Sequence, residues 1–261
     1  MRPGRPLSFW PREHGAYVQL LGPLACALLF GPTRAQAFLL AAAACAAFLA
    51  HEPVLVLLGR RGARVRSLYA GSARLRLALL GTFVVGAAAW SVASSTGLAL
   101  ALLVPTCLSL AAAAALLRGH ERALWAQLLS ATTLVSFTIP VLVASGRTLT
   151  AALQFAAGWL LVHVTATCAA RAYVYRRRDG ARGLAWATAL AAGVFLASAG
   201  LYAAGWAPGC FALACAPFVL IAALLLTRLV TFKSPKALGW SLTAANLAAF
   251  LAFGLELLAL G

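Results

Sequence analysis

Long apolar segments alternate with short polar ones along the whole chain. Nine apolar segments can be delimited, at residues 16–31, 35–58, 76–95, 97–117, 124–145, 149–171, 183–206, 208–230 and 239–260. Most of them are long enough to cross a hydrocarbon core about 30 Å thick as helices that rise about 1.5 Å per residue. The longest polar stretch, near residues 59–75, leaves no room for a soluble domain. The pattern therefore predicts an all-α fold: a polytopic membrane helical bundle of about nine transmembrane helices, forming a single domain over residues 1–261.

The basic residues mark every second gap between these segments. Of the 21 Lys and Arg residues, all but Arg34 and Arg147 lie in or beside these gaps. Because positive charge is retained on the cytoplasmic side during membrane insertion, the alternation predicts which gaps are cytoplasmic. We expect the N-terminus inside and the C-terminus outside. The expected cytoplasmic loops lie near residues 59–75, 118–123, 172–182 and 231–238.

The composition excludes an ordinary soluble protein. Hydrophobic residues make up 63% of the chain and charged residues 10%, whereas about a quarter of the residues of a soluble domain are charged. A net charge of +16 would suggest a nucleic-acid partner for a soluble protein. Here the charges lie beside apolar helices, where they orient the protein and contact anionic lipid headgroups. The expected partner is therefore the lipid bilayer, and we expect no nucleic acid.

The sequence offers little to a metal or a cofactor. Its single aspartate, Asp179, stands in a basic loop, and the chain has no DxxD pair, Walker loop, GxSxG or HExxH motif. The cysteines are scattered through the apolar segments without a CxxC pair, where cysteine usually behaves as a small apolar residue. They are Cys26, Cys45, Cys107, Cys168, Cys210 and Cys215. We expect no metal site, no cofactor, and no divalent-metal requirement for any activity.

Glu13 and His14 stand together where the chain enters the first apolar segment. They belong to the run Pro11-Arg12-Glu13-His14-Gly15-Ala16-Tyr17, in which a cation, an anion and an imidazole are consecutive. A capping pattern explains the same residues without a function, because proline and an acid are both favoured at a helix N-terminus.

His51 and Glu52 lie inside the second apolar segment, about 12 Å along a helix from the loop that follows. A carboxylate at this depth is costly unless it is protonated or faces the bundle interior with a partner, which makes it a candidate functional residue. The alternative is a short second helix from which Glu52 reaches the membrane interface.

The sixth apolar segment carries His163, Thr167 and Arg171 at intervals of four, so they share one face of a helix. Arg171 is the innermost charge of its region and could pair with a carboxylate in the bundle. A lone histidine such as His163 is more often hydrogen-bonded within a core than a ligand. We predict one pocket in the cytoplasmic half of the bundle, lined by Glu13, His14, His51, Glu52, Arg171 and His163.

The run from Pro11 to Tyr17 resembles the signature of the bacterial YwiC-like membrane proteins, although Tyr17 stands where tryptophan is expected. Two further stretches are similar to that family: Arg171-Ala172-Tyr173-Val174-Tyr175-Arg176 and Ser234-Pro235-Lys236-Ala237-Leu238-Gly239-Trp240. The resemblance implies a multi-pass protein of the bacterial cytoplasmic (inner) membrane and leaves its biochemical role open.

The nine-helix layout also resembles the intramembrane aromatic prenyltransferases of the UbiA type. Those enzymes bind a diphosphate through two aspartate-rich motifs that face the cytoplasm, and neither motif is present here. This likeness concerns the layout alone, and a fold does not carry a function.

Three functions fit the predicted pocket. It could bind an amphipathic or anionic small molecule, such as a quinone-like or isoprenoid lipid; in an enzyme, a histidine would then act as general acid or base. A proton-coupled secondary transporter could relay protons through intramembrane Glu and His. In a structural or assembly subunit, the polar residues would only pack helices. The sequence leaves open whether the protein is an enzyme and which oligomer it forms, because small residues occur on every predicted helix.

Overall fold

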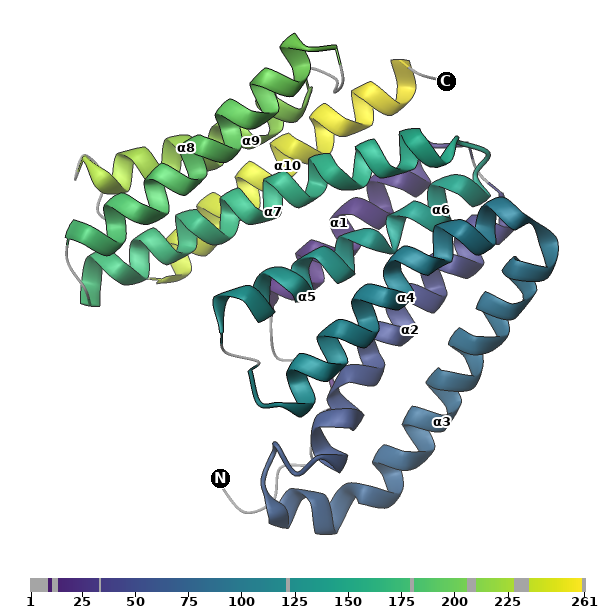
Figure 1. Ribbon diagram of the computed structural model, residues 1–261. Helices are drawn as coiled ribbons and strands as arrows, with labels where there is room; N and C mark the ends of the chain where they lie inside the picture. Colours follow the sequence, from purple (N-terminus) through teal and green to yellow (C-terminus); the bar gives the residue numbers. More distant parts are fainter. Residues whose placement is uncertain are drawn as a thin grey trace.

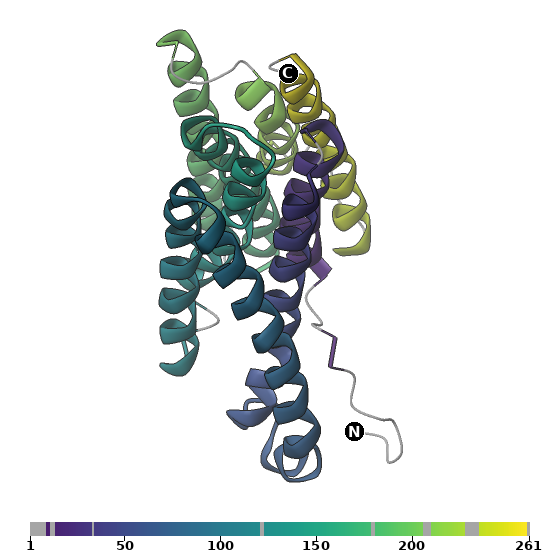
Figure 2. The ribbon, with the colours of Figure 1, turned by 90° about the vertical axis from the view of Figure 1, so that its right-hand side faces the viewer.

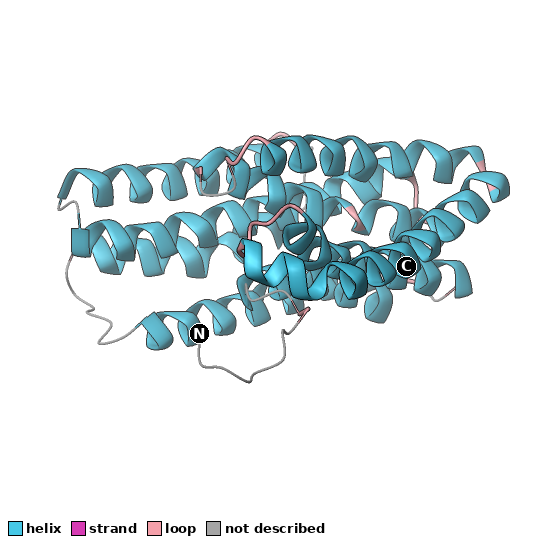
Figure 3. Cartoon of the chain, turned by 90° about the horizontal axis from the view of Figure 1, so that it is seen from below, coloured by secondary structure: helices cyan, strands magenta, loops and turns pink. Residues whose placement is uncertain are grey.

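The described part of the chain is folded into α-helices. The computed structural model describes residues 9–10, 14–32, 34–120, 123–178, 181–205, 210–227 and 235–259, and within these ranges no strand occurs (Figure 3). The helices of this part (Figure 1) are α1 (His14–Phe30), α2 (Ala35–Leu57), α3 (Ala63–Ser94), α4 (Thr96–Leu117), α5 (Leu124–Ser136), α6 (Thr138–Ala144), α7 (Leu149–Arg178), α8 (Ala181–Ala203), α9 (Cys210–Leu226) and α10 (Pro235–Ala259). The predicted all-α class is confirmed.

The helices follow the predicted apolar segments, one of which is divided in two. α5 and α6 together occupy the segment predicted at residues 124–145, with an interruption at Phe137. Pro140 explains the interruption, because proline has no N–H for the carbonyl of Ser136 and its ring crowds that turn. The hydroxyls of Ser136 and Thr138 each donate to a backbone carbonyl of the preceding turn at 2.7 Å.

Six helical segments of the described chain are long and apolar enough to cross a membrane. They are α2, α3, α4, the joined α5–α6, α7 and α10. The helices α1, α8 and α9 contribute shorter apolar stretches, at Ala16–Phe30, Thr188–Ala203 and Cys210–Leu225. Together with the composition, these helices make the chain a multi-pass membrane protein.

Two helices are longer than predicted. α3 begins at Ala63, so most of the loop predicted at residues 59–75 is helical. α7 runs on to Arg178, past the end predicted at residue 171. The prediction of long loops at these places was wrong, because charged residues end a membrane span without ending a helix. Arg, Ala and Leu, which are frequent in the α3 extension, all favour the helical state.

The helices run between two ends of the bundle (Figure 2). One, which we call the basic end, carries the α2–α3 and α4–α5 turns, with Arg60 and Arg118. The other, which we call the opposite end, carries the α1–α2 and α6–α7 turns, with Arg34 and Arg147. The last turn of α10 also lies at the opposite end, where Arg147 Nη2 donates to the Leu257 carbonyl at 2.9 Å.

α7 lies at the centre of the bundle, with α8, α9 and α10 on one side and α1, α5 and α6 on the other (Figure 1). α3 lies at the edge and packs mainly on α2. It exposes large apolar side chains along its length, among them Leu79, Phe83, Val85 and Trp90. In a membrane these side chains meet lipid, which is as apolar as they are.

The core is densest where aromatic rings of α7, α9 and α10 meet. The ring centroid of Phe253 lies 5.1 Å from that of Trp159 and 5.7 Å from those of Phe155 and Phe211. Gly158 of α7 lies against the same rings: a Cβ there would come within 2.6 Å of Phe253 and 2.7 Å of Phe211. Only glycine lets α7 approach these rings so closely.

The orientation in the membrane stays a prediction, and two exposed residues can test it. We expect Thr150→Cys, at the opposite end, to react with a membrane-impermeant maleimide in intact cells. We expect His120→Cys, at the basic end, to react only after permeabilisation, because the positive charge gathers at that end. Peptide mass spectrometry separates these adducts from those of native cysteines. The reverse labelling pattern would mean that the basic end faces outward.

Candidate functional site

Glu52 of α2, which is buried, forms an ion pair with the half-exposed Arg61. Its side chain is 0% exposed, and its two carboxylate oxygens accept from Arg61 Nε at 2.7 Å and Arg61 Nη2 at 2.6 Å. The two parallel hydrogen bonds match the planar guanidinium to the carboxylate, which is the strongest form of this pair. Glu52 therefore faces the protein interior and has the partner that its depth requires. His51, its neighbour, is exposed, because consecutive residues of a helix point in directions about 100° apart.

A glycine turn carries Arg61 back to Glu52. Gly59 has φ +73°, and Arg60 N donates to the Leu55 carbonyl at 2.9 Å while Gly59 N donates to that of Val56 at 3.0 Å. This double closure is the Schellman ending of a helix, which needs a left-handed residue and so favours glycine. The chain reverses within a few residues, and the guanidinium of Arg61 reaches back along the last turns of α2.

Arg60 makes a second connection from the same turn. Its Nη2 lies 3.4 Å from the carbonyl oxygens of Leu116 and Leu117 in the last turn of α4. A cation is favoured at a helix C-terminus, where carbonyl groups have no partner within the helix. The two consecutive arginines thus join α2, α3 and α4 at the basic end.

The chain before α1 lies close to this corner. Phe9 contacts the Tyr69 ring edge-to-face at 6.3 Å, and Arg76 lies 5.1 Å over the ring of Phe9. On α1, Tyr17 packs edge-to-face on Phe48 of α2 at 5.0 Å.

The contact of Tyr17 with Phe48 shows where His14, from the predicted pair Glu13–His14, lies along the bundle relative to the predicted pair His51–Glu52. His14 begins α1, one turn before Tyr17, and Glu52 lies one turn after Phe48. The chain therefore brings His14 and the His51–Glu52 pair to the same end of the bundle. Glu13 lies outside the described residues.

Arg171 has a different partner from Glu52. Its Nη2 donates to Gln127 Oε1 of α5 at 2.7 Å. Arg171 therefore joins α7 to α5, and the convergence of all the predicted residues on one pocket stays a prediction.

His163 lies deep in the core, two turns from Arg171 along the same face of α7. It is 1% exposed, and its ring stacks on that of Trp159 with centroids 5.6 Å apart and planes at 28°. Thr167, between His163 and Arg171 on this face, donates its hydroxyl to the His163 carbonyl at 2.8 Å. Within the described chain, neither His163 Nε2 nor Trp159 Nε1 has a hydrogen-bond partner, although both atoms are buried.

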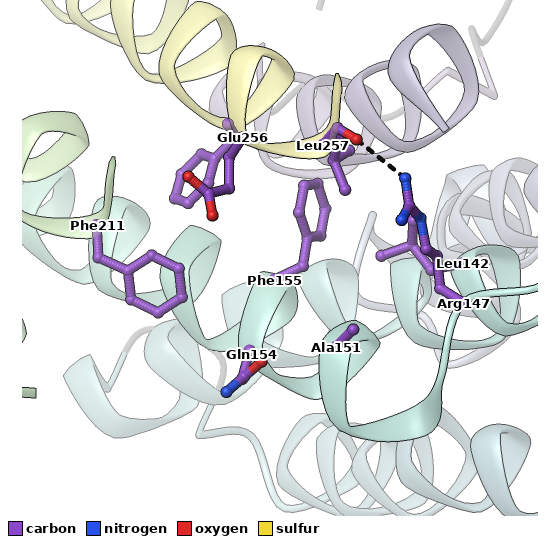
Figure 4. A pocket seen from close by; sticks show the side chains of 9 residues that line it. Leu142, Arg147, Ala151, Gln154, Phe155, Phe211, Glu256 and Leu257 are labelled. Carbon is purple, nitrogen blue, oxygen red and sulfur yellow. Dashed lines mark hydrogen bonds between the residues drawn. The ribbon is translucent and has the colours of Figure 1, made fainter. Parts of the chain in front are cut away.

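A small cavity opens at the opposite end (Figure 4). Its volume is about 40 Å³, and its polar lining comes from Arg147, Gln154 and Glu256. Such a volume holds a few water molecules, whereas sites for drug-sized ligands measure about 300–1,000 Å³. In the described chain no three His, Cys, Asp or Glu side chains gather as a metal site would need.

The first half of the chain also identifies its relatives. The sequence model of the YwiC-like protein family matches residues 10–143, which is more than half of the chain. The chain belongs to the YwiC-like family. No curated protein and no solved structure matches it. In this YwiC-like protein the matched region contains the Glu52–Arg61 pair and Arg60, and it ends before α7, which carries His163 and Arg171.

Sequence reasoning missed three residues of these sites in the YwiC-like chain. Arg61 was interpreted only as part of a topology signal, although it is the second cation after Glu52 along the chain and follows a glycine turn. Gln127 carries no distinctive signal, because a polar residue in an apolar helix commonly hydrogen-bonds to a neighbouring helix. Trp159, one turn before His163, carries a signal that could have been used, since a buried indole N–H normally has an acceptor.

Proposed function

We propose that this YwiC-like protein binds a small amphipathic or anionic molecule inside its helical bundle, in the cytoplasmic membrane of a bacterium. The observation that carries the proposal is the stacked pair of Trp159 and His163. The indole nitrogen Nε1 of Trp159 and the imidazole nitrogen Nε2 of His163 are buried, and neither has a hydrogen-bond partner in the described chain. An indole N–H can only donate. A buried donor without an acceptor costs about 1–3 kcal/mol, so an acceptor from outside the chain is the economical solution.

The chemistry of the two rings limits the ligand. It must bring a hydrogen-bond acceptor, such as a carbonyl, carboxylate or phosphate-ester oxygen, to the indole N–H and the imidazole. The rest of the molecule must be apolar, because Phe253 and other core side chains surround Trp159. This combination describes a lipid-like molecule with a polar group.

The polar face of α7 supports entry from the basic end. Thr167 and Arg171 follow His163 at intervals of four, about 12 Å along the helix to Arg171. Arg171 is half-buried and hydrogen-bonded to Gln127, so a positive group is held at the beginning of this face. It would attract the negative or polar group of an arriving molecule.

Mass spectrometry of the purified protein tests the proposal. We expect organic extracts of the wild type to contain one enriched small molecule in near-stoichiometric amount. Trp159→Phe and His163→Phe keep a ring and remove the nitrogens, and we expect each to reduce the recovered amount about tenfold, as the loss of about 1.4 kcal/mol of binding predicts. Trp125→Phe is the matched control, because Trp125 is 51% exposed on α5. Equal recovery from all variants, or no enriched molecule, would contradict the proposal.

A proton-coupled transporter is the second candidate, favoured by the burial of a titratable side chain, His163, in the middle of the apolar α7. Intramembrane histidines of this kind can relay protons. Uptake of a solute into vesicles that depends on an imposed pH gradient, and that His163→Phe abolishes, would favour this function. A bound molecule whose amount is insensitive to the gradient would favour the first.

A further inference from the structure

A layer of aromatic rings separates the Trp159–His163 pair from the cavity at the opposite end. Phe155, Phe211 and Phe253 all line that cavity, and Figure 4 shows Phe155 and Phe211 at its wall. The same Phe253 ring contacts Trp159, with centroids 5.1 Å apart and planes at 30°. One layer of rings therefore stands between the cavity and the indole.

The layer is closed on the side of α7. Gly158 brings the α7 backbone so near that a Cβ would meet Phe253 at 2.6 Å and Phe211 at 2.7 Å. Phe211 and Phe253 are each 1% exposed, and Phe155 is 6% exposed. We expect rings packed this closely to exclude water.

The two sides of this layer differ in chemistry. The cavity side has the side chains of Arg147 and Glu256, which favour water as a neighbour. The other side has the buried ring nitrogens Trp159 Nε1 and His163 Nε2, which have no hydrogen-bond partner among the described residues. A hydrated hydrogen-bond acceptor that crossed the layer of rings could bind these two nitrogens. The layer therefore controls which molecules can reach them from the opposite end.

We propose that Phe155, Phe211 and Phe253 form a barrier that closes the Trp159–His163 site toward the opposite end, with Phe253 as the residue that determines the side of access. The site is then reached only from the basic end, along the α7 face that carries Arg171. This inference rests on the proposed function for the identity of the site, and it adds the direction from which a ligand enters and leaves.

Thiol accessibility tests the barrier without any ligand. His163→Cys places a thiol behind Phe253, and a charged, membrane-impermeant methanethiosulfonate is applied to the face at which Thr150→Cys reacts. We expect no modification of His163→Cys alone. In His163→Cys combined with Phe253→Ala, we expect modification to become faster by about tenfold or more, since access no longer requires local opening of the packed core.

Two further variants keep the test decisive. Phe250→Ala removes another ring of α10, one that contacts Phe30 at 5.4 Å and does not line the cavity, and it should leave His163→Cys protected. If Phe253→Ala fails to fold, Phe253→Leu, which leaves a smaller gap, should still increase the rate over the parent. Gel filtration establishes which variants are folded, and peptide mass spectrometry assigns the adduct to position 163.

Two outcomes would overturn the barrier. One is modification of His163→Cys from the opposite face while Phe253 is intact. The other is a folded Phe253→Ala or Phe253→Leu variant that reacts no faster than Phe250→Ala. Neither outcome depends on a bound molecule, so failure of the barrier is distinguishable from failure of the co-purification experiment.

Discussion

Replacing Arg61 by alanine is expected to lower the stability of the protein by about 3–5 kcal/mol, since the change leaves a buried charge without its partner. Glu52 is 0% exposed and receives both of its hydrogen bonds to a cation from Arg61. In Arg61→Ala the carboxylate must either stay charged in the interior or take up a proton, and both cost free energy.

Matched variants separate the Glu52–Arg61 pair from the general loss of positive charge. Arg64→Ala removes an exposed arginine of the same helix and should change stability by less than about 0.5 kcal/mol. Glu52→Gln in the Arg61→Ala background removes the unpaired charge and should recover part of the loss. Melting temperatures in detergent, followed by fluorescence-detected gel filtration, provide the comparison. Equal losses in Arg61→Ala and Arg64→Ala would mean that the pair does not stabilise the fold.

Gly158→Ala is expected to destabilise the bundle, although alanine is the better helix former. In an open position the exchange gains about 1 kcal/mol. At Gly158 the new methyl group would lie 2.6 Å from Phe253 and 2.7 Å from Phe211, and forced overpacking of a core costs about 1–3 kcal/mol. The net change should therefore be a loss of stability.

Gly193 of α8 is the control for this substitution, because a Cβ there would have nothing within 4 Å. We expect Gly193→Ala to raise the melting temperature slightly and Gly158→Ala to lower it. Shifts of the same sign and size would show that the rings near Gly158 yield without cost.

The helices could be predicted because the membrane demands long apolar runs. Within the described residues each apolar segment is helical; α3 and α7 extend beyond their predicted bounds, and Pro140 divides one segment in two. The ends of helices were less predictable. A fall in hydropathy marks where α3 leaves the apolar layer, and nothing in Arg64, Arg66 or Arg74 stops a helix there.

The site was predictable where it depends on helical spacing. His163, Thr167 and Arg171 do share one face of α7, as the interval of four requires. The partner of Glu52 was not predictable in this way, because the direction in which Arg61 returns depends on the positive φ of Gly59. Spacing gives no information across a turn, and the same holds for the contact of Arg171 with Gln127, which lie on different helices.

The two arginines that break the charge alternation lie in neighbouring turns of the opposite end. Arg34 Nη2 lies 2.8 Å from the position that a Cβ on Gly146 would take, next to Arg147 in sequence. Residue 34 follows α1, and residue 146 precedes α7. This contact can therefore form only after the helices up to α6 have been synthesised, by which time we expect α1 and α2 to be inserted in the bilayer. Biogenesis of the protein should therefore pass through an inserted but loosely assembled stage, in which early helices are open to quality-control proteases and chaperones.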